Sequence, residues 1–380
     1  MRIAVDGRTL QSRPLGGIGR VVRGVLESLP AALGEVGLDV SGVDVLTDAR
    51  LAAPEAPALS PGTEIHHLRS LGPGRGPAWL QWTAPRWLRA HRDSRHVGLF
   101  HCPFYGLPYR QPVPMVVSLY DLTFLDHPDW FTPVSGTAFR AQARHAARTA
   151  RVVITGSDAV AGQISETLGV GRDRIVVARP AVDGVFLAAG SDRRAGRAAS
   201  AWRRGYLVAM GGAARRNLGV AVEAWRTARR AGAEVELVVV GPVTSVERRG
   251  LGTEEGLHLA GAVTDEELAR LLGGAVAFLY PTAYEGFGLP AAEAAAAGVP
   301  VICAPVGALP ELLGQAAEWC DPTPSGPSVE AAAGAVLRLV NDPERRARIG
   351  CAGHERLAAA PGHAAAARAW ARAYAVALQQ

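Results

Sequence analysis

The sequence predicts an α/β protein of two domains, each a parallel β-sheet covered by helices, with a ligand cleft between them. Length is the first observation, because 380 residues are too many for one compact hydrophobic core. The second is that strand-length apolar runs alternate with amphipathic helical stretches along the chain. The third is general: open parallel sheets bind ligands at the carboxyl ends of their strands, which favours a cleft between two of them.

The first domain is predicted to cover residues 1–185. Short apolar runs indicate its strands, and a period near 3.6 residues indicates its helices. The segment 54–77 is rich in Pro and Gly and is predicted to be loop with one short strand. The predicted strands are 2–5, 97–101, 115–119 and 152–155, and the predicted helices are 19–33, 78–91, 137–149 and 158–168.

A linker is predicted at 186–203, where the pattern changes to Ala, Gly, Ser and Arg. The second domain is predicted to cover 204–360. A last helix, 364–378, is apolar on more than one side and must pack against another element. The predicted strands are 206–210, 235–240, 257–260, 276–279 and 299–303, and the predicted helices are 218–231, 265–273, 290–297 and 329–340.

Composition excludes several classes of protein. The formal charge is only +5, and all 40 basic residues are arginines, so we expect anionic small molecules or a peripheral membrane contact and no nucleic acid. No apolar run reaches the roughly 18–20 residues of a membrane span, and the first residues read as a strand instead of a signal peptide. The four scattered cysteines are typical of a reduced, cytoplasmic protein.

The most informative segment is the turn between Glu285 and Glu293, which joins a buried strand to a helix beginning near Pro290. Free backbone N–H groups and the positive helix end make this turn a site for an anion such as a diphosphate. The two flanking carboxylates can bind hydroxyl groups on either side of that anion. This arrangement is suited to a nucleotide sugar.

Three other turns carry candidate residues. The glycines at 16–19 let a phosphate approach the backbone, although they can equally form a flexible connection. The segment 211–217 places Arg215 and Arg216 after a strand, where an arginine can contact phosphate or simply be solvated. Tyr120 and Asp121 follow a central strand, and Asp121 can be catalytic or a structural cap. His101 is predicted to be a packing residue.

The sequence contains no Asp-x-Asp pair, no P-loop, no G-x-S-x-G and no H-E-x-x-H. We therefore expect no metal ion and no cofactor beyond a nucleoside-diphosphate sugar as co-substrate. A departing diphosphate would then be stabilised by the helix dipole and an arginine.

With these residues placed, the chain resembles the family-4 retaining glycosyltransferases, whose GT-B fold has two Rossmann-like domains facing each other across a cleft. Glu285 to Glu293 matches the family's E-x7-E motif, and residues 286–290 match its usual Gly-Phe-Gly-Leu-Pro filling. Further matches cover nearly the whole chain: 6–8, 16–20, 121–122, 157–158, 180–183, 298–301, 308–311, 314 and 321–322. The last helix, within 361–380, resembles the family's helix that crosses back to the first domain.

The resemblance implies roles for individual residues. Glu285 would contact donor-sugar hydroxyls, and Glu293 the ribose. Arg216 stands where the family usually has a phosphate-binding lysine, and Tyr120 where many members have a histidine. The implied catalytic residues are Glu285, Tyr120, Asp121 and Arg216, and the implied donor-binding residues are Gly17, Gly212, Arg215, Arg216, Val263, Gly286, Phe287, Gly288, Leu289 and Glu293.

The predicted function is therefore metal-independent, retaining transfer of a sugar from a nucleoside-diphosphate donor inside a bacterial cell. The acceptor would be a glycan, a lipid-linked sugar or a specialised metabolite, bound near 72–91 and 105–108. Trp79, Trp82 and Trp87 there either face the acceptor or form a buried helix face. A sugar-nucleotide epimerase and a non-catalytic nucleotide-sugar-binding protein remain as alternatives, whereas a pyridoxal-dependent phosphorylase is excluded because the chain has no lysine.

Overall fold

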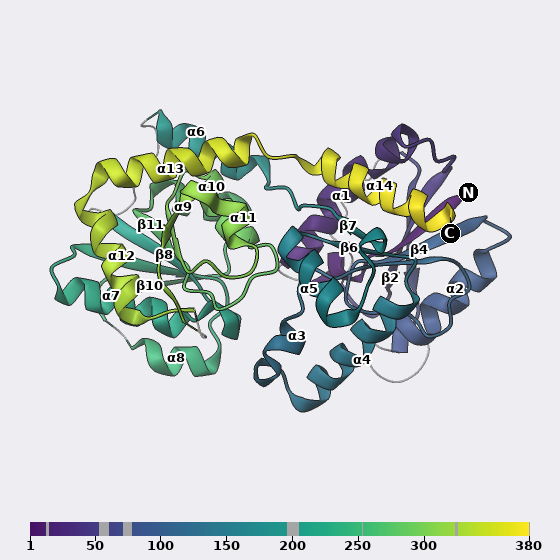
Figure 1. Cartoon of the computed structure of the whole chain (residues 1–380), viewed down its shortest axis with the longest axis horizontal. Helices are drawn as coiled ribbons and strands as arrows, with labels where there is room; N and C mark the ends of the chain where they lie inside the picture. Colours follow the sequence, from purple (N-terminus) through teal and green to yellow (C-terminus); the bar gives the residue numbers. More distant parts are fainter. Residues whose placement is uncertain are drawn as a thin grey trace. The chain divides into compact units, whose positions relative to one another are not determined.

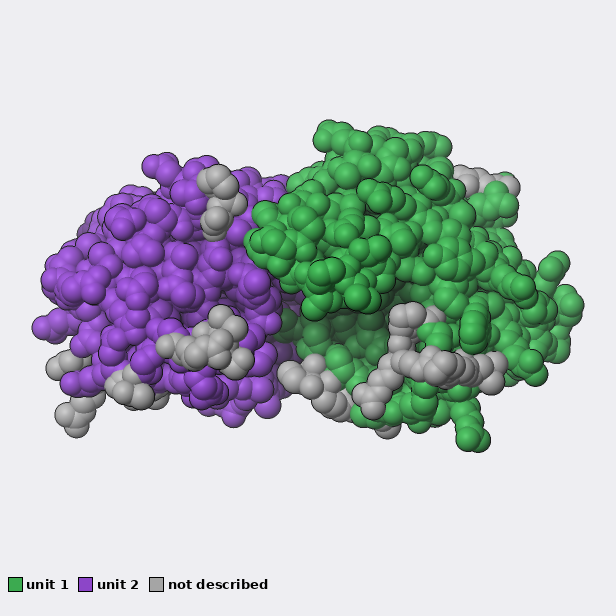
Figure 2. Space-filling model, turned by 90° about the horizontal axis from the view of Figure 1, so that it is seen from below, with its two compact units in different colours: residues 1–181, 361–380 green, residues 182–360 purple. Residues whose placement is uncertain are grey.

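A computed structural model describes residues 1–12, 15–52, 61–70, 78–195, 205–252, 254–323 and 326–379. The chain divides into two compact units, coloured separately in Figure 2. Unit 1 consists of residues 1–181 together with 361–380, and unit 2 of residues 182–360. Within the described residues, every helix is too short or too polar to cross a bilayer.

The sheet of unit 1 has seven strands in the order β3-β2-β1-β4-β5-β6-β7, all parallel. The direction of strand addition reverses between β1 and β4, so the loops after these two strands diverge to opposite faces of the sheet. The strands are β1 (Arg2–Asp6), β2 (Gly42–Asp48), β3 (Thr63–Leu68), β4 (Val97–Cys102), β5 (Met115–Ser118), β6 (Val152–Thr155) and β7 (Ile175–Val177).

Helices cover both faces of this sheet (Figure 1). The first helix, α1, and the last, α14, pack together although they stand at opposite ends of the chain. Trp370 and Tyr374 of α14 are fully buried, which explains its apolar composition. The other face carries α2, α4 and α5. The helical segments are η1 (Arg8–Gln11), α1 (Gly17–Glu35), η2 (Trp79–Thr83), α2 (Ala84–His91), α3 (Thr123–Asp126), η3 (Pro128–Trp130), α4 (Pro133–Thr149), α5 (Asp158–Leu168), η4 (Arg172–Arg174) and α14 (His363–Gln379).

Unit 2 contains a six-stranded parallel sheet in the order β10-β9-β8-β11-β12-β13, which repeats the arrangement of unit 1 with the reversal between β8 and β11. A two-stranded antiparallel ribbon follows the last strand of this sheet in the chain. The strands are β8 (Gly205–Met210), β9 (Val235–Val240), β10 (Leu257–Gly261), β11 (Ala277–Leu279), β12 (Val301–Cys303), β13 (Ala317–Trp319), β14 (Pro322–Thr323) and β15 (Gly326–Pro327).

Alternate residues of these strands enter two separate cores, as the two-residue period of a strand requires. Val208 and Phe278 face the core formed with α9 and α10, whereas Leu207 and Leu279 face the core formed with α7 and α12. The helical segments are α6 (Gly184–Arg194), η5 (Ala214–Arg216), α7 (Leu218–Arg230), α8 (Ser245–Leu251), α9 (Asp265–Gly274), α10 (Leu289–Ala296), α11 (Leu309–Leu313), η6 (Gly314–Ala316), α12 (Val329–Asn341) and α13 (Pro343–Ala358).

Every predicted strand and helix is present, with bounds that shift by a few residues. The predicted linker 186–203 is wrong in its first part, because Gly184–Arg194 forms α6, whose N-terminus is capped by the Asp183 side chain. Phe186 anchors this helix in the core of unit 2. Residues 196–203 of the predicted linker, and 54–60 and 71–77 of the predicted loop, lie outside the described residues.

Candidate active site

Most of the candidate site residues follow the two strands at which each sheet reverses its strand order, whereas Val263 follows β10 and Tyr120 and Asp121 follow β5. In unit 2 the segment 211–217 follows β8, and the segment 280–289 follows β11. In unit 1, η1 and then α1 follow β1. A loop follows β4, the strand next to β1 in the sheet. Loops that diverge at such a point leave room for a ligand at the carboxyl edge of the sheet.

Glu285 is a buried carboxylate with an exposed fraction of only 4%. The Tyr280 hydroxyl donates to its Oε1, and the Arg215 Nε lies 3.4 Å from the same oxygen. Burial, together with the negative charge of Glu285, raises the pKa of Tyr280 well above its usual value, so this hydroxyl remains a donor. Oε2 receives no hydrogen bond from any residue that the structure describes, which leaves it able to accept from a ligand hydroxyl.

The backbone of Glu285 is held in place by the loop that contains Gly307. The Ala308 N–H donates to the Glu285 carbonyl oxygen at 3.1 Å, and Gly307 has a left-handed φ of 54°. The Glu285 loop is therefore held by the loop that precedes α11, a contact that sequence reasoning missed. The signal available was a glycine directly before the predicted Ala-Leu-Pro-Glu match.

Helix α10 begins where the predicted motif places it. Gly288 is its N-cap with a φ of 91°, a conformation that favours glycine, and no described side chain caps the helix. No described residue accepts a hydrogen bond from the N–H groups of Phe287, Gly288 or Leu289. These donors and the positive helix end are groups that could bind an anion. Glu293 lies one turn further on and is 3% exposed, in a helix buried from Pro290 to Ala296.

The turn after β8 brings two arginines to this edge of unit 2. The Arg215 carbonyl accepts from the Ala283 N–H at 2.8 Å and from the Thr282 hydroxyl at 3.0 Å, so the two turns are joined. The Arg216 Nη1 donates to the Gly211 carbonyl, while its Nε is buried without a hydrogen-bond partner in the described structure. An unpartnered guanidinium N–H is costly to bury, and an incoming oxyanion would satisfy it.

The remaining donor-binding predictions of unit 2 lie on the same edge of the sheet. Gly212 packs against the Pro242 ring, next in space to the carboxyl end of β9. Val263 follows β10, just before Thr264 caps α9, and is partly buried against the core. The structure thus groups all the predicted residues of unit 2 at the carboxyl ends of β8, β10 and β11.

In unit 1, Gly17 is the first residue of α1. The N-cap of this helix is Gly16, so no described side chain caps the helix start. Tyr120 is buried after β5, and burial raises the pKa of its hydroxyl well above the usual value, so it is neutral. Asp121 Oδ1 accepts from the Thr123 N–H at 3.2 Å and from its hydroxyl at 3.0 Å. These two contacts fit the structural role predicted for Asp121, because its carboxylate holds Thr123, the first residue of α3, whose N-cap is Leu122.

His101 is a packing residue, as predicted. It is fully buried, with Nδ1 at 2.7 Å from the Tyr374 hydroxyl and Nε2 at 2.9 Å from the Ser118 hydroxyl. Burial lowers its pKa to about 3, so the ring is neutral. This pair links β4 and β5 to α14.

Sequence reasoning missed an ion pair after β1. Asp6 is buried and accepts from the Arg8 Nη2 at 2.6 Å, and the Arg8 guanidinium lies 4.3 Å from the centre of the Trp79 ring. Trp79 itself is fully buried, so it belongs to the helix face that packs inward. The Asp-Gly-Arg segment in the sequence could have indicated the ion pair. The contact of Arg8 with the Trp79 ring could not be predicted, because the two residues are far apart in the chain.

Among the described residues, one group of side chains has the composition of a metal site: Asp44, Glu64 and His66. Arg2 and Arg95 both contact Asp44, at 2.8 and 3.1 Å. Burial would raise the pKa of Asp44, but hydrogen bonds from Arg2 and His66 and the two guanidinium charges hold it below its usual range. Two arginines already neutralise this group, which does not fit a bound cation.

Sequence comparison places this geometry in a family. Residues 204–356 match the family model described as Glycosyl transferases group 1, and residues 15–184 match the one described as Glycosyltransferase Family 4. The chain belongs to the family-4 glycosyltransferases, as the E-x7-E motif predicted, and its two parallel-sheet units have the GT-B architecture.

Two curated relatives are mannosyltransferases. A segment of 92 residues is 44% identical to O-antigen chain mannosyltransferase B of Escherichia coli and covers 24% of this chain and 23% of that protein. Another, of 106 residues, is 38% identical to the MMP alpha-(1->4)-mannosyltransferase of Mycolicibacterium hassiacum and covers 28% of this chain and 26% of that protein. The chain therefore matches about a quarter of the length of each relative.

Solved structures share the fold over nearly the whole chain. Sucrose-phosphate synthase from Thermosynechococcus elongatus has a TM-score of 0.70 and 20% identity, covering 100% of this chain and 96% of that one. Anabaena HepE in complex with UDP-glucose has a TM-score of 0.67 and 15% identity, covering 99% of both chains. At these identities the likeness concerns the fold.

Proposed function

We propose that this chain transfers a hexosyl group from a nucleoside-diphosphate sugar to a glycan, lipid-linked or specialised-metabolite acceptor, with retention at the anomeric carbon. The observation that supports it best is the edge of unit 2 where Glu285 Oε2, the uncapped N-terminus of α10 and Arg216 lie on two joined turns. A carboxylate for sugar hydroxyls stands there next to donors for a diphosphate.

In the proposed complex the diphosphate lies at the N–H groups of Phe287, Gly288 and Leu289, and the Arg216 Nε donates to one of its oxygens. These groups stabilise the charge that develops on the diphosphate as the glycosidic bond breaks. They supply positive charge from the protein itself, so the proposal needs no metal ion.

Glu285 orients the donor sugar in this proposal. The Tyr280 hydroxyl and Arg215 hold Oε1, so the carboxylate is fixed while Oε2 accepts from a sugar hydroxyl. Glu293 would bind the ribose hydroxyls from the first turn of α10. The acceptor oxygen attacks the face from which the diphosphate leaves, and a diphosphate oxygen takes its proton, because no described side chain stands out as a nucleophile for double displacement.

Nucleoside-diphosphate release tests the proposal. The full chain is incubated with GDP-mannose, UDP-glucose or ADP-glucose and a set of acceptors, with and without EDTA. We expect release that depends on acceptor, resists EDTA and gives a product of retained configuration by NMR. Glu285→Gln should lower kcat/KM by at least about a hundredfold, or roughly 2.7 kcal/mol of transition-state stabilisation.

Glu330→Gln, on the exposed side of α12, is the matched control and should leave turnover unchanged. Near-normal turnover in Glu285→Gln would refute the role of this carboxylate. Donor binding without nucleoside-diphosphate release across all acceptors would favour a non-catalytic binding protein, and release that needs no acceptor would favour an epimerase.

A further inference from the structure

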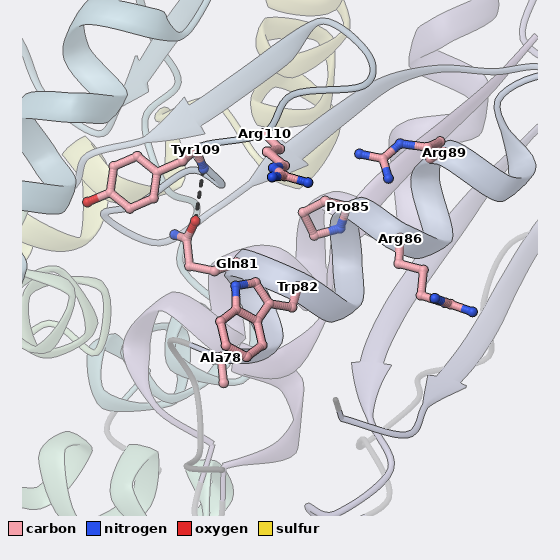
Figure 3. Close-up of a pocket in the computed structure, with 8 residues that line it drawn as sticks. All are labelled: Ala78, Gln81, Trp82, Pro85, Arg86, Arg89, Tyr109 and Arg110. Carbon is pink, nitrogen blue, oxygen red and sulfur yellow. Dashed lines mark hydrogen bonds between the residues drawn. The ribbon is translucent and has the colours of Figure 1, made fainter. Parts of the chain in front are cut away.

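A concave site lies in unit 1, beside the start of α2 (Figure 3). Its volume is about 700 Å³, within the roughly 300–1,000 Å³ typical of small-molecule sites. Two aromatic side chains line it, Trp82 with an exposed fraction of 59% and Tyr109 with 61%. Large aromatic rings that remain this exposed are available to stack on a ligand.

Hydrogen bonds hold the walls of this pocket together. The Gln81 Oε1 accepts from the Tyr109 N–H at 2.9 Å, drawn as a dashed line in Figure 3, and its Nε2 donates to the Leu107 carbonyl at 3.3 Å. The Tyr109 ring also packs on His145 of α4, with ring centres 4.5 Å apart. The loop after β4 is thereby fixed to η2, so the two rings belong to a preformed site.

The charge of the pocket is uniformly positive. Arg86, Arg89 and Arg110 line it, and no acidic side chain does so among the lining residues of the described structure. Among the described residues, no ion pair or side-chain hydrogen bond involves any of these three arginines. The position of Arg89 in the last turn of α2 is favourable for the helix dipole, but this reason does not extend to Arg86 or Arg110.

The helix itself argues against a membrane as the occupant. Trp79, Leu80 and Leu88 are buried, so the apolar face of the helix is used in the core. The exposed face carries Trp82, Arg86 and Arg89 at four- and three-residue spacing. A helix that lies in a bilayer interface needs a broad apolar face, and a single tryptophan in a concave surface does not supply one.

We propose that this pocket, the Trp82 groove, binds an acceptor saccharide that carries negative charge as carboxylate or phosphate. The flat indole and phenol rings would stack on the apolar faces of sugar rings, and the guanidinium groups would pair with the oxyanions, in two-pronged contacts where geometry allows. The proposal rests on the proposed glycosyltransferase function and names the acceptor class for it. It also states that the specificity for acidic acceptors is carried by unit 1.

Direct binding tests the proposal without relying on turnover. The full chain is titrated calorimetrically at low salt with a glucuronate-containing tetrasaccharide, the same tetrasaccharide with its carboxyl groups reduced, and a phosphomannose oligosaccharide. We expect at least one of the acidic probes to bind about tenfold or more tightly than the neutral one, and added salt to reduce that difference because it screens the charges.

Variants separate charge from stacking. Arg89→Gln with Arg110→Gln should abolish the preference for the acidic probe, and Trp82→Ala should weaken acidic and neutral probes alike. Arg148→Gln with Arg372→Gln removes the same charge from exposed positions on α4 and α14 and should change neither. Equal affinity for acidic and neutral probes, or no effect of the paired groove variant, would overturn the proposal.

Two further outcomes are decisive. Vesicles containing phosphatidylglycerol that bind the chain through Trp82 and Arg89, when no oligosaccharide does, would assign the groove to a lipid surface and refute the proposal. Binding of nucleoside diphosphate to unit 2, lost with Arg216→Ala, reports separately on the proposed function. Failure of the groove and failure of the donor site are therefore distinguishable.

Discussion

Gly307 lies directly against the backbone of Glu285. A Cβ atom on residue 307 would be 2.0 Å from the Glu285 carbonyl oxygen, closer than any real contact, and the φ of 54° disfavours other residues as well. The loop before α11 therefore determines where the carboxylate of Glu285 stands. A glycine with no chemistry of its own positions the most important acid of the candidate site.

This contact predicts a large effect for Gly307→Ala. The methyl group must displace the Glu285 loop, so we expect kcat/KM to fall by at least about tenfold and the melting temperature to fall by several degrees. Gly34→Ala, in α1 with open space around the added atom, is the control and should preserve activity. Full activity in Gly307→Ala would show that the loop tolerates the displacement.

Tyr280 provides a second test of the same carboxylate. Tyr280→Phe removes the hydroxyl that donates to Glu285 Oε1, a hydrogen bond to a charged group worth about 1.5–3 kcal/mol. We expect kcat/KM to fall roughly tenfold to a hundredfold. Tyr206→Phe loses a partly buried hydrogen bond to the Leu271 carbonyl in the same unit, at 2.6 Å, and should reduce stability while preserving kcat/KM. Equal kinetic losses in the two variants would contradict a specific role for Tyr280.

Arg216 separates charge from geometry. Arg216→Ala should reduce kcat/KM by about a hundredfold or more and weaken binding of the nucleoside diphosphate, because in the proposed complex the buried Nε donates to a phosphate oxygen. Arg216→Lys restores the charge but not the fork of donors, so partial recovery is expected. Arg270→Ala, on the exposed side of α9, is the control. Unchanged nucleotide affinity in Arg216→Ala would remove this residue from the site.

The lowered pKa of His101 leads us to expect that the stability of unit 1 falls at acidic pH. Its folded pKa of about 3 lies below the ordinary value near 6.5, so the unfolded chain binds a proton that the folded chain does not between these pH values. The contribution of His101 to stability is complete above about pH 6.5 and falls by roughly 1.4 kcal/mol per pH unit as the pH drops toward 3. Hydrogen exchange of unit 1 peptides at pH 7, 6 and 5 measures it.

In His101→Gln the side chain is neutral at every pH, so the acid dependence of unit 1 should become shallower by that amount. His258→Gln, in unit 2 beside Glu236, should leave the unit 1 dependence unchanged. Identical slopes for His101→Gln and the parent chain would contradict a neutral buried histidine.

The sequence allowed the long periodic elements and the glycine turns to be predicted, because these depend on local pattern. Strand β2 escaped prediction because its buried Asp44 and Thr47 break the apolar run, yet both find partners on neighbouring strands. Helix α6 resembled a linker because Phe186 is its only large side chain that is fully buried, while Val185 and Leu187 are only partly buried against the same core. Helix α8 was missed because it is too short to show a helical period in the sequence. A Thr244–Glu247 capping box stabilises its N-terminus.

The candidate site divides in the same way. Its Glu285 turn and the start of α10 were predictable because the motif is contiguous. The contacts that orient it are not contiguous: Gly307 reaches Glu285 across 22 positions and Arg215 across 70. The Trp82 groove combines the start of α2 with the loop after β4, so its pairing with Tyr109 required the fold.

The position of α14 at the end of the chain affects how the protein folds during synthesis on the ribosome. Unit 1 lacks α14, the helix that carries the buried Trp370 and Tyr374, until all of unit 2 has been synthesised, which takes roughly 10–40 s at about 5–20 residues per second. During that interval the sheet face beside α1 is uncovered, and His101 has no Tyr374 to meet. Unit 2 can therefore be folded before unit 1 is complete, and a nascent chain stalled before Pro361 would expose an apolar surface to chaperones.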